Sequence, residues 1–208
     1  IAGAGTLTKL GAGKLSLSDT TNRTDFTGQL NLSGGAVSTT VVSALPAGKI
    51  TFSNAGQLEI TPSVQQNLLN AIDVGTGGGN IFTSTSSVLI DGLVSGSGNL
   101  TFSGSAEKRI TNTGNKNTFT GGITVDGANA TLRTDTTADP FGTGTITLSN
   151  SGGLNLNPGT NGFTINNNIV VSGGASLSSF NGGNITLAGN LTGAGTLQIS
   201  SARGPYVI

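Results

Sequence analysis

The sequence predicts an all-β protein folded as a parallel β-helix, a solenoid in which short strands alternate with tight corners. Three observations predict this fold: a long internal repeat, short runs in which apolar and polar residues alternate, and corners rich in glycine and asparagine. A sandwich or barrel would also give alternating runs, but it has no need of a long super-repeat. Stacked coils are therefore the favoured architecture.

The chain of 208 residues repeats itself at a period of roughly 95 residues. The opening segment Ile1–Thr8 returns as Val94–Thr101 and again as Leu191–Gln198, each time with a Gly-x-Gly-x-Leu pattern. A longer match joins Ile50–Pro62 to Ile146–Pro158. Self-similarity of this kind marks a solenoid whose units bury their apolar faces against their neighbours.

We expect one continuous domain over residues 1–208, with degenerate super-repeats at about 1–92 and 93–190 and a partial third copy at 191–208. The chain opens inside a repeat motif and has no initiator methionine, which indicates a segment of a longer protein.

Short runs of period 2 follow one another about every 8–12 residues, as in an all-β protein. Their Leu, Ile, Val and Phe residues are predicted to face inward and their Thr, Ser and Asn residues outward. Phenylalanine recurs at matched positions, Phe26 with Phe119 and Phe82 with Phe180, which predicts aromatic stacking between coils in the interior. The clearest runs are Lys14–Ser18, Lys49–Ser53, Gln57–Thr61, Asn99–Phe102, Thr145–Ser149 and Asn184–Leu187.

Glycine and asparagine gather between these runs, in segments such as Gly75–Asn80. Both residues tolerate positive φ, so these segments are predicted to be corners rather than helical connections. The one stretch with helical spacing is Ser63–Ile72, but its counterpart Gly159–Ile169 has no such spacing. A helix is therefore not expected there.

Composition excludes several classes of function. Only 9% of residues are charged, with nine Lys and Arg against nine Asp and Glu. Such a surface has no electrostatic footprint for nucleic acid, and no apolar run approaches the roughly 20 residues that span a bilayer, so neither nucleic-acid binding nor membrane insertion is expected. The chain has no Cys, which excludes disulfides and thiolate metal sites.

The segment Gly3-Ala-Gly-Thr-Leu-Thr-Lys-Leu-Gly-Ala-Gly-Lys-Leu-Ser-Leu-Ser18, followed by Phe26-Thr-Gly-Gln-Leu30, resembles the autotransporter-associated β-strand repeat. Pro140-Phe-Gly-Thr-Gly-Thr-Ile-Thr-Leu148 is similar to the same family's small loop followed by a Gly-flanked strand, and the resemblance covers nearly the whole chain. The second copy departs from the pattern, since it loses the second Gly-x-Gly and has Glu107 in place of Lys14.

The resemblance implies a right-handed β-helix in a secreted or surface-anchored bacterial protein, outside the cell. Its expected role is non-catalytic: a rigid stalk, a filament or an adhesive surface. The implied partners are neighbouring repeats of the parent protein or further copies end to end, with surface glycans or proteins of the host or of bacteria. Two alternatives stay open, a self-assembling extracellular filament or sheath subunit and a polysaccharide-processing β-helix enzyme.

Such an enzyme would need two or three carboxylates, or a Lys or Arg base, converging on one face. The chain has no His, and among its acids only Asp135 and Asp139 are close in sequence, where they are interpreted as turn formers ahead of Pro140. We therefore predict no catalytic, cofactor-binding or metal-ligating residue and no cofactor. The acids are Asp19, Asp25, Glu59, Asp73, Asp91, Glu107, Asp126, Asp135 and Asp139.

Three further patterns are interpreted without a special function. The corner Gly75–Asn80 lacks both the Asp of a calcium-binding repeat and the Gly-Lys-Ser/Thr of a phosphate loop. The basic residues Lys108, Arg109 and Lys116 have no aromatic residues among them and are interpreted as a solvated loop. Asn-x-Ser/Thr sequons arise by chance in a chain of this composition, and they occur at Asn22, Asn31, Asn99, Asn129, Asn184 and Asn190.

Overall fold

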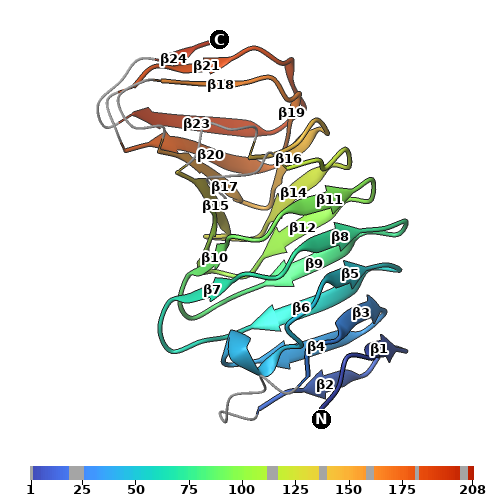
Figure 1. The fold of residues 1–208 in the computed structure, drawn as a ribbon. Coiled ribbons are helices and arrows are strands. Elements are labelled where there is room, and N and C mark those ends of the chain that lie inside the picture. Colours follow the sequence, from blue (N-terminus) through green and yellow to red (C-terminus); the bar gives the residue numbers. More distant parts are fainter. Residues whose placement is uncertain are drawn as a thin grey trace.

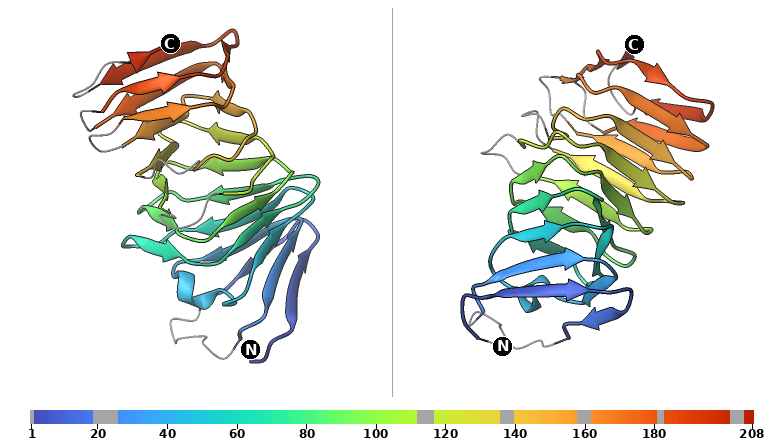
Figure 2. Two further views of the ribbon diagram at one scale, coloured as in Figure 1. Left: turned by 45° about the horizontal axis from the view of Figure 1, so that its top comes forward. Right: turned by 90° about the vertical axis from the view of Figure 1, so that its right-hand side faces the viewer.

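The computed structural model of the chain describes residues 2–18, 26–111, 117–135, 140–157, 162–180, 183–201 and 206–208. Within these ranges the protein is a β-solenoid whose strands stack into columns along one axis (Figure 1, Figure 2). The helical element there is a single 3₁₀ turn, η1 (Val42–Ala44). The predicted all-β parallel β-helix is confirmed.

The strands form four sheets, which we number in chain order. Sheet 1 contains β1 (Thr6–Leu10), β3 (Gln29–Ser33), β5 (Ile50–Phe52), β8 (Ile72–Val74) and β11 (Val94–Gly96). Sheet 2 contains β2 (Lys14–Ser16), β4 (Ala36–Thr39), β6 (Gly56–Ile60), β9 (Gly79–Phe82), β12 (Leu100–Ser103), β14 (Ile123–Asp126), β16 (Ile146–Ser149), β19 (Ile169–Ser172) and β22 (Leu191–Thr192). Sheet 3 contains β7 (Gln66–Leu68), β10 (Val88–Ile90), β13 (Glu107–Ile110), β15 (Thr131–Thr134), β17 (Gly153–Leu156), β20 (Gly174–Ser179) and β23 (Thr196–Ser201). Sheet 4 contains β18 (Phe163–Ile165), β21 (Ile185–Leu187) and β24 (Tyr206–Val207).

From β5 to β11 the chain visits sheets 1, 2 and 3 in turn and then returns to sheet 1 one layer further on. The strands before β5 alternate between sheets 1 and 2, and those from β12 to β17 alternate between sheets 2 and 3. Paired strands are parallel, and paired residues lie from 20 positions apart, as between β3 and β5, to 24 apart, as between β13 and β15. Towards the C-terminus sheet 4 follows sheet 3 in each coil and so takes the place of sheet 1. The nine strands of sheet 2 mark eight turns of the solenoid.

Apolar residues form continuous ladders inside the coils because alternate side chains of every strand face inward. In sheet 2 one ladder runs in register through eight successive strands, and its members from the second onward are at most 3% exposed. A buried side chain of this kind stabilises the fold by roughly 1.5–3 kcal/mol. The ladder consists of Leu15, Val37, Leu58, Ile81, Phe102, Val125, Leu148 and Val171.

The strands predicted from the sequence are confirmed, and Ser63–Ile72 contains the strand β7 rather than a helix. The predicted aromatic stacking is wrong for Phe82 and Phe180. Phe82 follows the inward Ile81 and therefore faces outward, and Phe180 is 55% exposed. Phe26 and Phe119 are buried as expected.

The super-repeat does not return to the same face of the solenoid. The three copies of the opening motif lead into β1, β12 and β23, which lie in sheets 1, 2 and 3 respectively. The matched leucines of these strands are Leu7, Leu100 and Leu197, separated by 93 and 97 positions. That spacing is four coils plus about a third of a coil, so each copy begins one face further round.

Side-chain hydrogen bonds follow the same relation. The Nδ2 of Asn70 donates to the backbone carbonyls of Pro46 and Gly48 at 2.8 and 2.6 Å. Asn167 donates to the carbonyls 96 positions after those two, at 3.0 and 2.7 Å. Each asparagine therefore ties one corner to the corner of the preceding coil, and the super-repeat preserves this clamp while moving it to a new face.

Candidate functional sites on the outer faces

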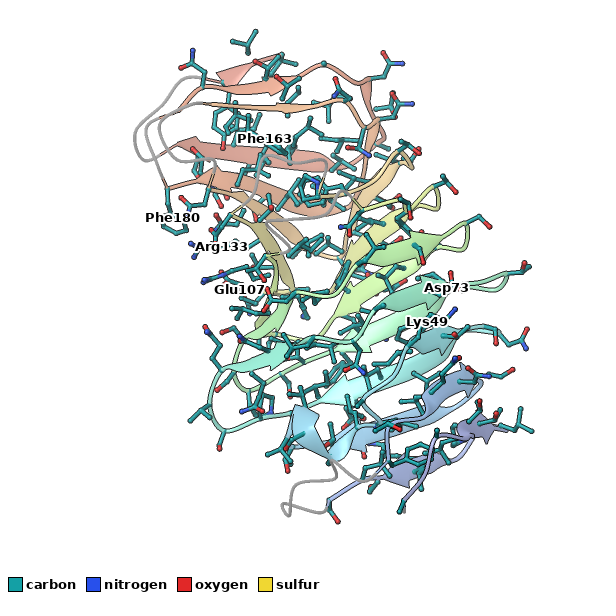
Figure 3. The ribbon with its side chains drawn as sticks, viewed as in Figure 1. Lys49, Asp73, Glu107, Arg133, Phe163 and Phe180 are labelled. Carbon is teal, nitrogen blue, oxygen red and sulfur yellow. The ribbon has the colours of Figure 1, made fainter. Side chains whose placement is uncertain are left out.

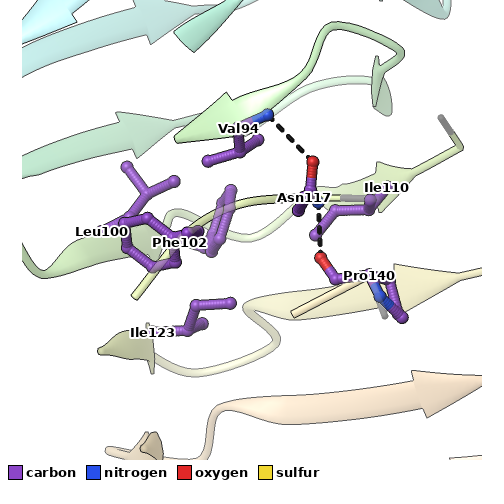
Figure 4. Close-up of a pocket in the computed structure, with 8 residues that line it drawn as sticks. Val94, Leu100, Phe102, Ile110, Asn117, Ile123 and Pro140 are labelled. Atoms are coloured by element: carbon purple, nitrogen blue, oxygen red, sulfur yellow. Dashed lines mark hydrogen bonds between the residues drawn. The ribbon is translucent and has the colours of Figure 1, made fainter. Parts of the chain in front are cut away.

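One small cavity lies inside the coils, among the described residues. A cavity of about 10 Å³ lies beside Asn117 (Figure 4), which is about the space that one water molecule occupies. The Oδ1 of Asn117 accepts from the Val94 amide at 2.9 Å, and its Nδ2 donates to the Pro140 carbonyl at 2.7 Å. The other lining residues are Leu100, Phe102, Ile110, Phe119 and Ile123. This cavity is too small for a ligand larger than water, and the larger hollows of the described structure lie on the outer faces.

Four charged residues meet on the outer face of sheet 3. Arg109 of β13 lies in register with Arg133 of β15, an arrangement that alone would be unfavourable. Glu107 forms an ion pair with Arg109 at 2.9 Å, and Asp135 forms an ion pair with Arg133 at 2.8 Å. The diagonal contacts close a square, since Arg109 lies 3.3 Å from Asp135 and Arg133 lies 3.8 Å from Glu107. These side chains are 20–28% exposed, so their mutual screening by water is limited.

The square continues towards an exposed aromatic ring. The guanidinium carbon of Arg133 lies 6.0 Å from the ring centroid of Phe180, within reach of a cation–π interaction. Figure 3 shows Glu107, Arg133 and Phe180 following one another on the same side of the solenoid. Next to them, Asn157 donates to Asp135 at 2.7 Å. The Oδ1 atoms of Asn155 and Asn157 are buried and accept no hydrogen bond from the described residues, which costs about 1–3 kcal/mol each.

Lys108 points into the core from the same strand, so the interpretation of Lys108 and Arg109 as a solvated loop is wrong. Lys108 is fully buried, in register between Val88 and Leu132 in the inward ladder of sheet 3. Its Nζ donates to the carbonyl of Gly104 at 2.8 Å. Burial lowers the pKa of this amine from 10.5 to about 7. Lys116 lies outside the described residues.

The acids noted in the sequence do not otherwise converge. Among the acids that the structure describes, only Glu107 and Asp135 share partners, Arg109 and Arg133. The other described acids lie apart: Glu59 near Lys14 at 2.7 Å, Asp73 near Lys49 at 3.6 Å (Figure 3), Asp91 bonded to Thr111, and Asp126 bonded to Ser149 at 2.7 Å. Those outside the described residues are Asp19, Asp25 and Asp139. Within the described ranges no three His, Cys, Asp or Glu residues are grouped to hold a metal ion.

Two shallow hollows lie on the outer faces, and both are lined by neutral residues alone. The first hollow, of about 290 Å³, spans three successive strands of sheet 2. It is lined by Ala55, Gln57, Gly77, Gly78, Gly79, Asn80, Asn99 and Thr101. The second hollow, of about 320 Å³, spans three successive strands of sheet 3. It is lined by Ser151, Gly174, Ala175, Ser176, Thr196 and Gln198.

Sequence reasoning treated Gly75–Asn80 as a plain corner and did not connect it with the strands on either side. The corner is confirmed up to Gly78, with Gly77 and Gly78 at φ of 88° and 71°, whereas Gly79 and Asn80 already belong to the strand β9. The hollow above it arises because strands one coil before and one coil after bring their side chains alongside. The available signal was the super-repeat, which places this corner and the Gly173–Gly174 corner at matched positions.

No protein-family model, curated protein or solved structure matches this chain. Membership of the autotransporter-associated repeat family therefore stays a prediction. In the part of the chain that the structure describes, no helix has the length and apolar character needed to cross a membrane.

Proposed function

We propose that this chain is a non-catalytic segment of a bacterial surface or secreted protein, serving as a rigid stalk with an adhesive outer face. The observation that carries the proposal is the inward ladder that continues in register through eight strands of sheet 2. Each coil packs on the next and hydrogen-bonds to it along the axis, so added coils extend the molecule without a hinge.

The charged square supports a structural role rather than catalysis. Glu107 and Asp135 each contact both arginines, with distances of 2.8 to 3.8 Å. A glycosidase places one carboxyl group where it can protonate the leaving oxygen and the other where it can activate water or attack the sugar. Here guanidinium groups occupy the positions around both carboxylates, and the same contacts join β13 to β15.

The enzyme alternative has a direct test. The purified chain is incubated with soluble plant and bacterial polysaccharides, and release of reducing ends is measured beside the Glu107→Gln variant. The proposal predicts no release above a protein-free control. Release that Glu107→Gln abolishes, with its fold intact by circular dichroism, would replace the stalk by a polysaccharide-processing enzyme.

A filament subunit is the second candidate, and the two end coils favour it. In the described structure β1 and β23 each pair on one side only, and unpaired strand edges are templates for further pairing. Apolar side chains lie exposed at both ends, namely Leu10 at one end and Leu191, Ile199, Val207 and Ile208 at the other. A further coil, either of a longer parent chain or of a second copy, would cover them.

Electron microscopy separates the two candidates. The stalk proposal predicts isolated short rods at every concentration tested. Uniform long fibres that grow with concentration, and that shorten when Leu10 is replaced by Lys, would make assembly the function.

A further inference from the structure

We propose that the two outer hollows are equivalent binding sites, each for a single neutral sugar ring, presented from adjacent faces of the solenoid. The inference rests on the adhesive role proposed above and names the sites and the ligand class that would serve it. Both hollows are present without any rearrangement of the chain.

The two hollows correspond through the super-repeat at six of the eight lining positions of the first hollow, all but Gln57 and Gly77. Four lining positions of the first hollow recur 96 residues later in the second, and two recur 97 residues later. The matched pairs are Ala55 with Ser151, Gly78 with Gly174, Gly79 with Ala175, Asn80 with Ser176, Asn99 with Thr196, and Thr101 with Gln198. One architecture has thus been built twice, first on sheet 2 and then on sheet 3.

The side chains differ between the hollows, yet the matched polar positions stay polar and uncharged. Where one copy has Asn80 the other has Ser176, and where one has Thr101 the other has Gln198. Each replacement exchanges one uncharged group that can both donate and accept for another. No lining position carries an ionisable group in either copy.

The second hollow presents polar groups that are free to bind. Among the described residues, the side chains of Ser151, Ser176, Thr196 and Gln198 form no hydrogen bond with another protein group. Three hydroxyl groups and one carboxamide therefore line one hollow with their donors and acceptors available. A sugar ring carries several neighbouring hydroxyl groups, each both donor and acceptor, which such a lining can satisfy.

The first hollow is held in place by bonds among its own side chains. Asn80 donates to the Oε1 of Gln57 at 3.0 Å, and Asn99 donates to the hydroxyl of Thr101 at 3.2 Å. These bonds leave the Nε2 of Gln57 without a protein partner in the described structure, as a donor for a ligand. Fixing the side chains beforehand reduces the entropy that binding would cost.

The floor of the first hollow is backbone, and it cannot be filled by a longer side chain. A Cβ on Gly78 would lie 2.5 Å from the carbonyl oxygen of Asn99, and one on Gly77 would lie 2.8 Å from the amide nitrogen of Asn54. Both glycines also have positive φ. The Gly77 carbonyl accepts from the Ala55 amide, and the Gly78 amide donates to the Gly75 carbonyl. The corner therefore keeps its shape, and the polar groups that it offers to a ligand are those of the side chains around it.

Charge and size select the ligand class. An anionic ligand would find no cation in either hollow, whereas a neutral sugar needs none. Volumes of about 290 and 320 Å³ lie at the lower end of ligand pockets, so each hollow fits one ring rather than a long oligosaccharide. Neither hollow is lined by an aromatic residue, so we expect weak binding, with dissociation constants of roughly 1 mM or more.

Two weak sites can act together on a surface. The hollows are separated by about four and a third coils, which at 4.7–4.9 Å per strand is about 20 Å along the axis. A polysaccharide coat that offers many rings would engage both sites and gain avidity without any new contact. Duplication therefore suits binding to a repeating glycan layer better than capture of a free sugar.

Amide chemical shifts of the isotope-labelled chain test the proposal. Glucose, galactose, mannose and N-acetylglucosamine are each titrated to about 100 mM, with glucuronate as the anionic comparison. At least one neutral sugar should shift the amides of residues 77–80 and 174–176 together, and glucuronate should shift them less. Thr101→Trp should abolish the shifts at the first hollow alone, and Gln198→Trp those at the second alone.

The matched controls place the same bulk nearby on the same faces. Thr147 lies in the same outward column of sheet 2 as Thr101, and Ser200 lies two residues after Gln198 on β23. Thr147→Trp and Ser200→Trp should leave all shifts unchanged. The proposal is overturned if no neutral sugar shifts either hollow, if shifts centre elsewhere, if glucuronate binds as well, or if the controls act like the hollow variants. None of these results would bear on the stalk, which the hydrolysis and microscopy experiments test separately.

Discussion

Replacing Lys108 by methionine should stabilise the folded chain at neutral pH. Lys108 occupies a position in the core ladder between Val88 and Leu132, where both neighbours in the ladder are apolar. Methionine has a similar length and no charge, so it can fill the same space with little strain. The single polar contact that is lost is the bond from Nζ to the carbonyl of Gly104.

The size of the effect follows from the pKa of Lys108. Each tenfold change in an equilibrium is worth about 1.4 kcal/mol, and burial lowers this pKa from 10.5 to about 7. At pH 7 the folded state therefore loses about 4 kcal/mol relative to an unfolded chain whose lysine stays charged. Loss of the hydrogen bond offsets about 1 kcal/mol, so Lys108→Met should gain about 3 kcal/mol.

The sign of the pH dependence is also fixed. Between pH 7 and pH 10.5 the unfolded state binds more protons at Lys108 than the folded state does, so stability rises with pH across this window. Below pH 7 the penalty is present in full. Urea unfolding at several pH values should show a gain of about 3 kcal/mol for the natural chain between pH 7 and about pH 9.5, and this gain should be missing in Lys108→Met.

A surface lysine provides the control. Lys49→Met removes a side chain that is 43% exposed, and it should change stability by no more than about 0.5 kcal/mol. The reasoning is refuted if Lys108→Met is no more stable than the natural chain at pH 7 while the natural chain's stability stays level as the pH rises.

Two further substitutions test the packing of the corners. Gly121→Ala should destabilise the fold by roughly 3 kcal/mol or more, because the added Cβ would lie 1.8 Å from the Gly98 carbonyl oxygen. A Cβ on Gly13 meets no atom within 4 Å, so Gly13→Ala should be nearly neutral. Thermal unfolding compares the two variants, and equal melting temperatures would contradict the close approach at Gly121. Asn167→Ala should cost about 2 kcal/mol because two partly buried carbonyls lose their donor. Replacing the exposed Asn67 by Ala should cost little. Urea midpoints compare the two variants, and similar losses would show that the clamp is unimportant.

The strands and corners could be predicted from the sequence because apolar and polar residues alternate within each strand and Gly or Asn residues lie between the strands. The run from Lys49 to Ser53, for example, becomes β5 with Ile50 and Phe52 buried. Phe82 was assigned to the wrong face because matched spacing was given more weight than the alternation of its own strand. A shift of one residue moves a side chain to the other face, and Ile81 already marked the inward position.

The charged strand β13 shows how weakly a single strand marks its inward face when charged residues dominate it. In Glu107–Ile110 three charged residues follow one another, and Ile110 is the one apolar guide within the strand. Alternation from Ile110 places Lys108 inward, and the register with Val88 and Leu132 in neighbouring coils gives the same placement. The two hollows were missed for a different reason, since each depends on three strands that are about one coil apart in sequence.

Stretching one molecule between its termini, which lie at opposite ends of the solenoid (Figure 1), tests most directly whether the stacked coils make a rigid segment. The account predicts stepwise unravelling, with each step releasing one coil of 20 to 24 residues, or about 70–85 Å of extended chain. Smooth extension at low force would contradict the account, and so would a first step that releases several coils at once.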